Sequence, residues 1–280
     1  MTDLYLKRRL QNWIIFAISV LVTLISLFFL FWILKSTIQK GLPILDLKLL
    51  TQDTPAPGSQ GGLKNAITGS LLMIVIGILI GTPVGILAGT FLAEFGAGKK
   101  VATTIRFFND VLLSTPSIIT GLFIYSILVV PMKHFSALAG ALSLALIALP
   151  IIVRTTDEML KVVPTALKEA ALALGAPRWK MVTSISYRAA APGILTGILL
   201  AISRISGETA PLLFTALSNQ FSSLNLFRPI ANLPVIIFQF AMSPYNDWKN
   251  LAWAGSLIAV AAVLSLSLLS RLLLIRGKHK

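Results

Sequence analysis

Residues 154–190 read RTTDEMLKVVPTALKEAALALGAPRWKMVTSISYRAA, a basic loop between two long apolar runs. In its middle, small and apolar residues recur at helical spacing and form one face of a short helix: Ala166, Leu167, Ala170, Ala171 and Leu174. Lys168 and Glu169 stand beside this face. A helix with a shallow alanine face and a charged edge is suited to docking into a groove of another protein.

Gly175 is expected to be the hinge between two short helices in this loop. It can adopt the left-handed conformation that a C-terminal cap needs, and the following Pro177 favours the start of a second helix. Upstream, Thr155 and Glu158 have the spacing of a capping box. Pro164 either opens the first helix or kinks a continuing one. The sequence thus predicts a helix, the hinge and a second helix.

The spacing of Glu169-Ala170-Ala171, Gly175 and Ile185 resembles the E-A-A loop of ABC importer permeases. The resemblance implies an all-α integral membrane protein of the type I ABC importer permease class. It also implies that these residues belong to a cytoplasmic coupling helix that docks into a cleft of an ATPase. Arg188 stands where many family members have Pro, so the exit from the second loop helix is expected to differ.

Three blocks narrow the resemblance to the PstA family of phosphate permeases. They read KEAALALGAPRW (Lys168–Trp179), APGILTG (Ala191–Gly197) and RISGETAPLLFTA (Arg204–Ala216). With a weaker likeness at residues 114–123 and 241–248, the similarity covers about half of the chain. The resemblance implies three kinds of partner: a second, homologous permease subunit (PstC-like), two cytoplasmic ABC ATPase subunits (PstB-like) and an extracytoplasmic phosphate-binding protein (PstS-like). The sequence itself shows no partner.

The composition places the chain in a membrane. Of its 280 residues 56% are hydrophobic and 12% are charged, with a mean hydropathy of +0.85, whereas roughly a quarter of residues are charged in soluble domains. The absence of cysteine excludes a disulfide framework and cysteine-based metal or nucleophile chemistry. The net charge of +14 would suit nucleic-acid binding only if the charges formed a patch, so their placement decides its meaning.

Six apolar runs have the length of membrane-spanning helices and form a single transmembrane permease domain over residues 1–280. The expected spans are residues 13–34, 66–92, 111–130, 135–153, 191–217 and 251–274. In the second span, every fourth residue from Gly77 to Gly89 is glycine, which makes a ridge either for close packing or for sliding along a translocation path. Residues 233–242 are expected to form a short outer helix, either a lid or a helix packed for stability.

The placement of the basic residues predicts the topology. Sixteen of the 24 Lys and Arg residues lie near the two termini, in residues 99–106 and in the 154–190 loop. Seven lie on the other side of the six spans, and Arg204 lies within a span. The positive-inside rule therefore places both termini and the 154–190 loop in the cytoplasm. The chain is expected to be a multi-pass protein of the bacterial inner (plasma) membrane, and nucleic-acid binding loses its support.

Arg204 and Glu208 are charged residues inside the fifth span, where each would cost on the order of 2.5–3.5 kcal/mol at mid-bilayer. At helical spacing they share a stripe with Gly193, Gly197 and Ala201, so they are expected to face protein or a water-filled path. One interpretation is a salt bridge that only locks the bundle. In the other interpretation, the fixed guanidinium of Arg204 donates hydrogen bonds to a passing anion. Glu208 holds Arg204 in place and neutralises its charge again when the anion leaves. The resemblance favours the second and implies phosphate as the anion.

The leading functional hypothesis is a membrane-spanning subunit of an ATP-driven phosphate importer that works by alternating access. The sequence has no G-x-x-x-x-G-K-[ST] loop, so ATP hydrolysis is expected from partner subunits and the chain is not expected to be an enzyme. His134 and His279 are the only histidines, and no metal site or cofactor is expected. The alternatives are a permease for another oxyanion such as molybdate or sulfate, a secondary anion transporter, and, from another class, an intramembrane enzyme using Ser206 and Glu208.

Overall fold

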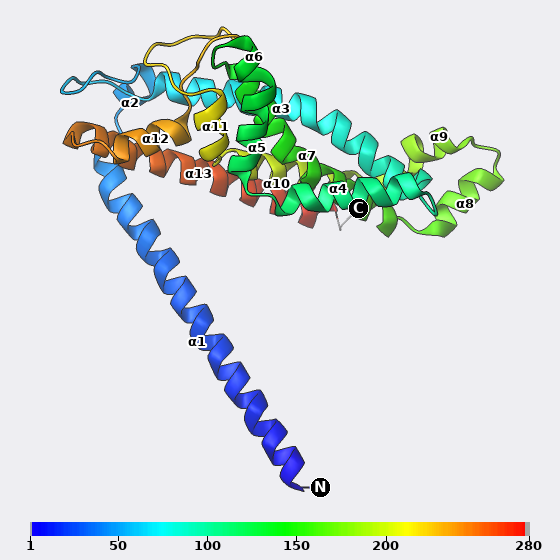
Figure 1. Ribbon diagram of the computed structural model, residues 1–280. Helices are drawn as coiled ribbons and strands as arrows, with labels where there is room; N and C mark the ends of the chain where they lie inside the picture. The colour runs from blue at the N-terminus through cyan, green and yellow to red at the C-terminus, as the bar shows by residue number, and fades with distance from the viewer. Residues whose placement is uncertain (1, 278–280) are drawn as a thin grey trace.

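The computed structural model describes residues 2–277, and within this range the chain forms helices and no strand (Figure 1). In chain order the helices are α1 (Thr2–Gly41), α2 (Leu47–Thr51), α3 (Lys64–Thr90), α4 (Lys100–Ser114), α5 (Ser117–Ile124), α6 (Val130–Met132), α7 (Ala137–Val162), α8 (Thr165–Ala173), α9 (Arg178–Met181), α10 (Tyr187–Ile205), α11 (Ala210–Thr215), α12 (Leu233–Ala241) and α13 (Asn246–Gly277). Short turns of other helical geometry join some of them: a 3₁₀ turn at Leu42–Ile44 and π-helical turns at Phe91–Phe95, Tyr125–Val129 and Val182–Ser186. The end of the expected basic tail, Lys278–Lys280 with His279, lies outside the described residues.

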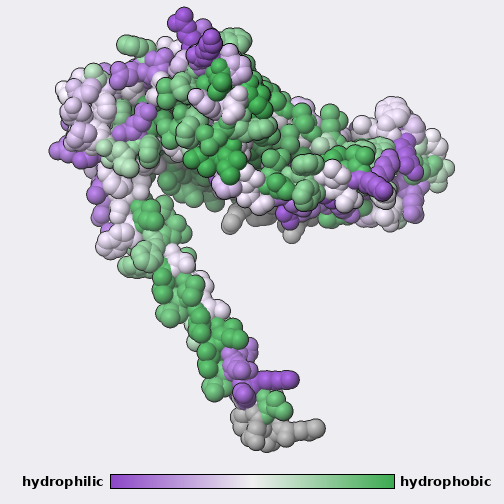
Figure 2. Space-filling view, viewed as in Figure 1, coloured by the Kyte–Doolittle hydropathy of each residue, from purple (hydrophilic) through white to green (hydrophobic). Residues whose placement is uncertain are grey.

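The helices have the length and composition of membrane spans. Among the described residues, five helices are long and apolar enough to cross a membrane. The bent pair formed by Lys100–Ser114 and Ser117–Met132 gives a sixth span if the two segments together count as one. Figure 2 shows apolar side chains along α1 and over the middle of the body, with hydrophilic side chains gathered toward its ends. The predicted all-α, multi-span fold class is therefore confirmed.

The third span differs from the single run expected at residues 111–130. α4 ends at Ser114, and the following helical segment, Ser117–Met132, leaves it at 107°. Thr115 has extended backbone, and Pro116 lacks an N–H group and disfavours a helical residue before it, so the helix does not continue across this dipeptide. In Figure 1, α4 runs along the bundle and α5 turns across it, packed against α7 and α11.

α7 continues well into the loop that the sequence predicts at residues 154–190. The capping box predicted at Thr155 and Glu158 is wrong, because both residues lie inside α7. The hydroxyl of Thr155 donates back to a carbonyl one turn earlier at 2.9 Å, and Glu158 accepts a hydrogen bond from Arg154 at 2.9 Å. The helix ends just before Pro164, as the restriction on residues that precede proline requires.

The glycine ridge of α3 packs directly on α7, and this contact forms the core of the bundle. A Cβ atom added at Gly77 would lie 3.0 Å from the carbonyl oxygen of Ala141, and one at Gly89 would lie 2.7 Å from that of Val153. Helices approach this closely only where side chains are absent, and in a membrane such packing holds helices together. Of the two interpretations of the ridge, the structure supports close packing.

Polar contacts join distant segments at the end of the bundle opposite α8 and α9. Asn65, at the start of α3, donates to the carbonyls of Asn219 and Gln220 at 3.1 and 3.0 Å. Its side-chain oxygen accepts from the backbone N–H of Thr54 at 3.1 Å. α12 lies at this end, capped by the side chain of Asn232 and packed against α3 and α13. The apolar segment expected at residues 233–242 is thus a packed helix.

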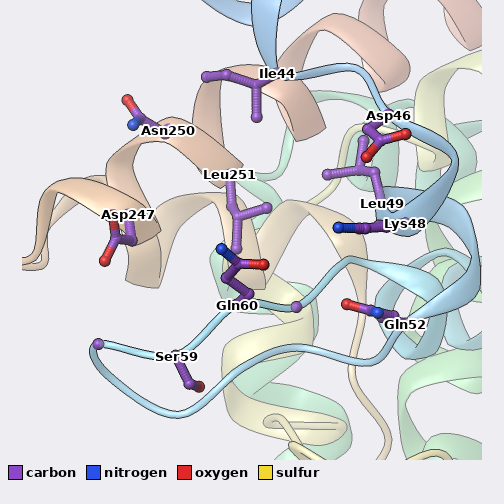
Figure 3. A pocket seen from close by; sticks show the side chains of 12 residues that line it. Ile44, Asp46, Lys48, Leu49, Gln52, Ser59, Gln60, Asp247, Asn250 and Leu251 are labelled. Atoms are coloured by element: carbon purple, nitrogen blue, oxygen red, sulfur yellow. The ribbon is translucent and has the colours of Figure 1, made fainter.

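A hollow of about 550 Å³ opens at the same end, between α2, the loop that follows it and the start of α13. Figure 3 shows Asp46 and Lys48 on one side, Asp247 and Asn250 on the opposite side, and Gln60 from the loop between them. In Figure 1, α2 and the helices α8 and α9 lie at opposite ends of the bundle. The hollow is therefore separate from the 154–190 loop.

α1 extends away from the rest of the molecule (Figure 1). Its C-terminal end packs on α13, where Gly41 lies against the carbonyl of Trp253. Along the remainder, large apolar side chains are exposed, as for Phe31 with 65% of its surface accessible. A helix of this composition requires lipid or other membrane-embedded helices as its surroundings.

Candidate functional site

The 154–190 loop contains the predicted pair of short helices. α8 follows Pro164, which occupies its N-cap position, and α9 follows Pro177. Gly175 joins them with a φ of 84°, a left-handed conformation in which an L side chain would be strained. The hinge predicted at Gly175 is confirmed. α9 then leads through a π-helical turn into α10, and Arg188 lies in the first turn of α10.

Lys168 fastens α8 to the core of the bundle. Its Nζ lies 2.8 Å from Oε1 of Glu94, in the π-helical turn that follows α3, and donates to the carbonyl of Leu160 in α7 at 3.0 Å. The two charged side chains are only 16% and 6% exposed. The sequence placed Lys168 at the edge of the docking face, but nothing in it indicated a partner 74 residues earlier in the chain.

The outward surface of α8 is narrower than the sequence predicted. Glu169 and Ala170 are exposed, whereas Ala171 is 6% exposed and packs against α9 and the turn after it. Ala171 therefore does not belong to a free docking face, because the hinge folds the second loop helix over it. Leu174 and Trp179 are 89% and 65% exposed beside the hinge. The free surface thus combines one carboxylate with small and large apolar side chains.

A second charged cluster joins α4 and α7 to the π-helical turn that follows α3. Asp157 Oδ2 lies 2.7 Å from Nζ of Lys161 and 3.3 Å from Nε of Arg106, and Arg106 also donates to the carbonyl of Leu92 at 2.9 Å. Sequence reasoning missed this cluster. The four-residue spacing of Asp157 and Lys161 is a local signal that could have found half of it.

Arg204 and Glu208 meet, but by a different geometry from the one expected. α10 ends at Ile205, so Glu208 lies beyond the helix, in the turn before α11, and the helical stripe predicted to carry both charges is wrong for Glu208. Nη1 of Arg204 nonetheless lies 2.5 Å from Oε1 of Glu208. The carboxylate side chain is 4% exposed and that of Arg204 is 57% exposed. A buried carboxylate therefore holds a guanidinium that is open to its surroundings.

The break between α4 and α5 encloses a cavity of about 50 Å³ next to this pair. Thr115, Ser117 and Thr120 line it together with Arg204 and apolar residues of α7. Sequence reasoning did not select these hydroxyls. The only available signal was the Thr115-Pro116-Ser117 tripeptide, which marks a break in the third span.

Residues 81–275 match the family of binding-protein-dependent transport system inner membrane components. The chain belongs to this family. Over 265 residues it is 55% identical to the phosphate transport system permease protein PstA of Pasteurella multocida and 56% identical to that of Haemophilus influenzae. These matches cover 95% of this chain and 95% and 94% of the two relatives. The inward-facing MetNI methionine ABC transporter has a similar fold, with a TM-score of 0.61 at 20% identity over 76% of this chain and 93% of that chain.

Both candidate features of this transport-system membrane component lie within the matched residues. The matched range includes α8, α9 and Gly175 as well as Arg204, Glu208 and the α4–α5 break. Across residues 2–277 no group of three or more His, Cys, Asp or Glu side chains could hold a metal ion. The two features that the structure offers are therefore an exposed carboxylate on α8 and a guanidinium that is open to its surroundings and held by a buried carboxylate.

Proposed function

We propose that this membrane component is the PstA-type permease subunit of an ATP-driven inorganic phosphate importer. The observation that carries the proposal is the identity of 55% and 56% to two PstA phosphate permeases over 95% of the chain. An open guanidinium in a membrane-spanning helix agrees with it, because the planar donor fork of arginine matches the oxygens of phosphate.

Partner subunits supply the energy for transport. Two cytoplasmic PstB-like ATPases hold α8 of this chain and the corresponding helix of a PstC-like permease subunit, and a PstS-like protein delivers phosphate from outside. When ATP draws the two ATPases together, both loop helices move with them, and the spans alternate between inward-open and outward-open states. The exposed surface around Glu169 supports this role, and Glu169 pairs with a basic residue of the ATPase.

Arg204 is the positive charge on the path of phosphate, and Glu208 is its counter-ion. The burial of Glu208 and its 2.5 Å contact support this assignment, because they hold the guanidinium in place while leaving it open. As phosphate enters, the guanidinium turns to the phosphate oxygens. When phosphate leaves, the guanidinium forms its ion pair with Glu208 again. A single cation does not balance a multiply charged anion, so the PstC-like subunit contributes further positive charge.

The basic 154–190 loop and both termini face the cytoplasm. The excess of Lys and Arg on this side supports the orientation through the positive-inside rule. With six spans, counting the broken third span as one, both termini come to the same side of the inner membrane. The hollow of Figure 3 then faces the outside, where the binding protein docks.

Reconstitution with the partner subunits tests the proposed function. Proteoliposomes that contain the full complex should take up radiolabelled phosphate only when ATP is present with the ATPases. Excess sulfate or molybdate should not compete with phosphate. Competition at equal concentration would assign the chain to another oxyanion, and uptake driven by an ion gradient without ATPases would assign it to secondary transport.

A further inference from the structure

The break between α4 and α5 places the start of a helix in the middle of the bundle. α4 ends at Ser114 and α5 begins at Ser117, at 107° to each other. The first N–H groups of a helix have no partner inside it, and the helix dipole adds partial positive charge at that end. Pro116 occupies the N-cap position, and its carbonyl accepts the N–H group of Ile119 at 2.9 Å, but its ring cannot accept the N–H groups of Ser117 and Ile118. This end of α5 is thus electrostatically suited to an anion.

Two hydroxyl groups stand at the same end of α5 without a partner. Ser117 and Thr120 both line the cavity that Arg204 lines, and Thr120 is 6% exposed. Within the part of the chain that the structure describes, neither hydroxyl makes a hydrogen bond, whereas the nearby Thr115 and Ser126 donate to carbonyls of the preceding turn at 2.7 and 2.9 Å. Thr120 is a buried residue and Ser117 a partly buried one, and no acceptor among the described residues occupies either hydroxyl, so both groups are available to a ligand.

A second helix break lies against the first. α5 and α11 pack so closely that a Cβ atom at Gly121 would lie 2.5 Å from the Cα of Pro211. Glu208, which binds Arg204, lies in the turn just before α11. The guanidinium of Arg204, held by Glu208 at the break between α10 and α11, therefore faces the same cavity as the hydroxyls at the break between α4 and α5.

We propose that Ser117, Thr120 and the first backbone amides of α5 bind the transported anion opposite Arg204. This inference rests on the proposed function, in which the anion is phosphate. Arg204 contributes the charge, and the hydroxyls and amides donate neutral hydrogen bonds to the remaining oxygens. The cavity of about 50 Å³ is larger than the roughly 10–15 Å³ that a single water needs, so several oxygen atoms fit within it.

Phosphate uptake by the full complex in proteoliposomes tests this inference. Thr120→Val keeps the branched shape and removes the hydroxyl, and Ser117→Ala removes the other. Each change should lower kcat/KM for inorganic phosphate roughly tenfold, as expected when a donor to a charged ligand is lost. Thr120→Ser should restore most of the loss, because it retains the hydroxyl. Ser126→Ala, on the same helical segment but with its hydroxyl bonded to a carbonyl, should leave uptake unchanged.

The pattern of results separates the inference from the proposed function. If Thr120→Val and Ser117→Ala transport normally while Arg204→Gln does not, the hydroxyls do not contact phosphate, although the pathway charge stands. If Thr120→Ser is as impaired as Thr120→Val, the loss reflects packing and the inference is overturned. If the unaltered complex takes up no phosphate, the proposed function itself fails.

Discussion

Lys168 of α8 and Glu94 after α3 form an ion pair of 2.8 Å in which both side chains are largely buried. The same ammonium group donates to the carbonyl of Leu160 in α7 at 3.0 Å. One side chain of α8 is thus fixed to α7 and to the turn that follows α3, and the contact between α3 and α7 forms the core of the bundle. In the proposed docking, a displacement of α8 by the ATPase would be transmitted to both helices through this side chain.

Replacing Lys168 with Met should destabilise the protein and weaken coupling. Glu94 would stay buried without its cation, and such a change costs about 3–5 kcal/mol when one member of a buried pair is removed. We expect the detergent-solubilised complex to unfold at a lower temperature. In proteoliposomes, ATP hydrolysis should drive less phosphate uptake, which the ratio of imported phosphate to hydrolysed ATP would measure.

The charge-swapped double variant Lys168→Glu with Glu94→Lys separates the pair from the loss of either residue. The double variant should regain part of the unfolding temperature and of the ratio of imported phosphate to hydrolysed ATP that Lys168→Met loses. If it regains neither, the attraction between the two charges does not account for the stability or the coupling. Glu158→Gln serves as a control. It breaks an exposed pair with Arg154, and exposed pairs contribute little to stability, so the unfolding temperature should hardly change.

Glu169→Lys should uncouple ATP hydrolysis from phosphate uptake. Glu169 is exposed on α8, and in the proposed docking it meets a basic residue of the ATPase, so a reversed charge would repel it. The complex should still hydrolyse ATP but import little phosphate. Glu158→Lys makes the same charge change on the exposed surface of α7 and should leave the ratio unaltered. Normal coupling in the Glu169 variant would remove this residue from the docking surface.

Local signals explain what the sequence predicted correctly. The hinge at Gly175 and the short helices around it follow from periodicity and from Gly and Pro as local stop signals. Thr155 misled because the same hydroxyl that caps a helix can instead donate to a carbonyl inside one.

Contacts between distant segments explain what the sequence did not predict. Lys168 and Glu94 lie in different helices, and no local pattern relates them. The burial of Ala171 depends on how α9 folds over α8. The place of Thr120 beside Arg204 depends on the 107° turn between α4 and α5. Each of these is a product of tertiary packing, which spacing within one helix does not specify.

Two glycines of the α3 ridge should respond differently to the same substitution. A Cβ atom at Gly89 would lie 2.6 Å from the Cβ of Thr156 and 2.7 Å from the carbonyl of Val153, so Gly89→Ala must push α3 and α7 apart. We expect a loss of about 1–3 kcal/mol and a lower unfolding temperature of the complex. At Gly81 the nearest atom would be the carbonyl oxygen of Ala145 at 3.3 Å, a contact that a shift of a few tenths of an ångström relieves, so Gly81→Ala should cost clearly less. Equal effects at both positions would contradict this account of the ridge.

Arg204→Gln should abolish phosphate uptake while the complex still assembles and hydrolyses ATP. The change removes the charge proposed to attract phosphate and keeps a polar side chain that can donate a hydrogen bond to Glu208. Because the carboxylate of Glu208 is only 4% exposed and loses its cation, the unfolding temperature should fall, as for Lys168→Met, so uptake is compared per assembled complex. Co-purification of the subunits checks assembly, and uptake in proteoliposomes checks transport. Arg204→Lys should transport poorly, because an ammonium group keeps the charge without the planar fork. Uptake at the normal rate in Arg204→Gln would show that this residue is not the pathway charge.

Glu208→Gln should have the opposite effect on binding. The amide of Gln is nearly the same size as the buried carboxylate but does not neutralise Arg204. Phosphate would then bind Arg204 without competition from Glu208. When phosphate leaves, no carboxylate would be present to form the ion pair with Arg204 again. Both KM and kcat for uptake should fall, the pattern expected when a ground state is bound more tightly than before. A pair that only locks the bundle gives a different result: Glu208→Gln and Arg204→Gln would each reduce the amount of assembled complex, and the complexes that do form would keep the normal KM. The direction of the change in KM therefore decides whether the ion pair lies on the path of phosphate or only holds helices together.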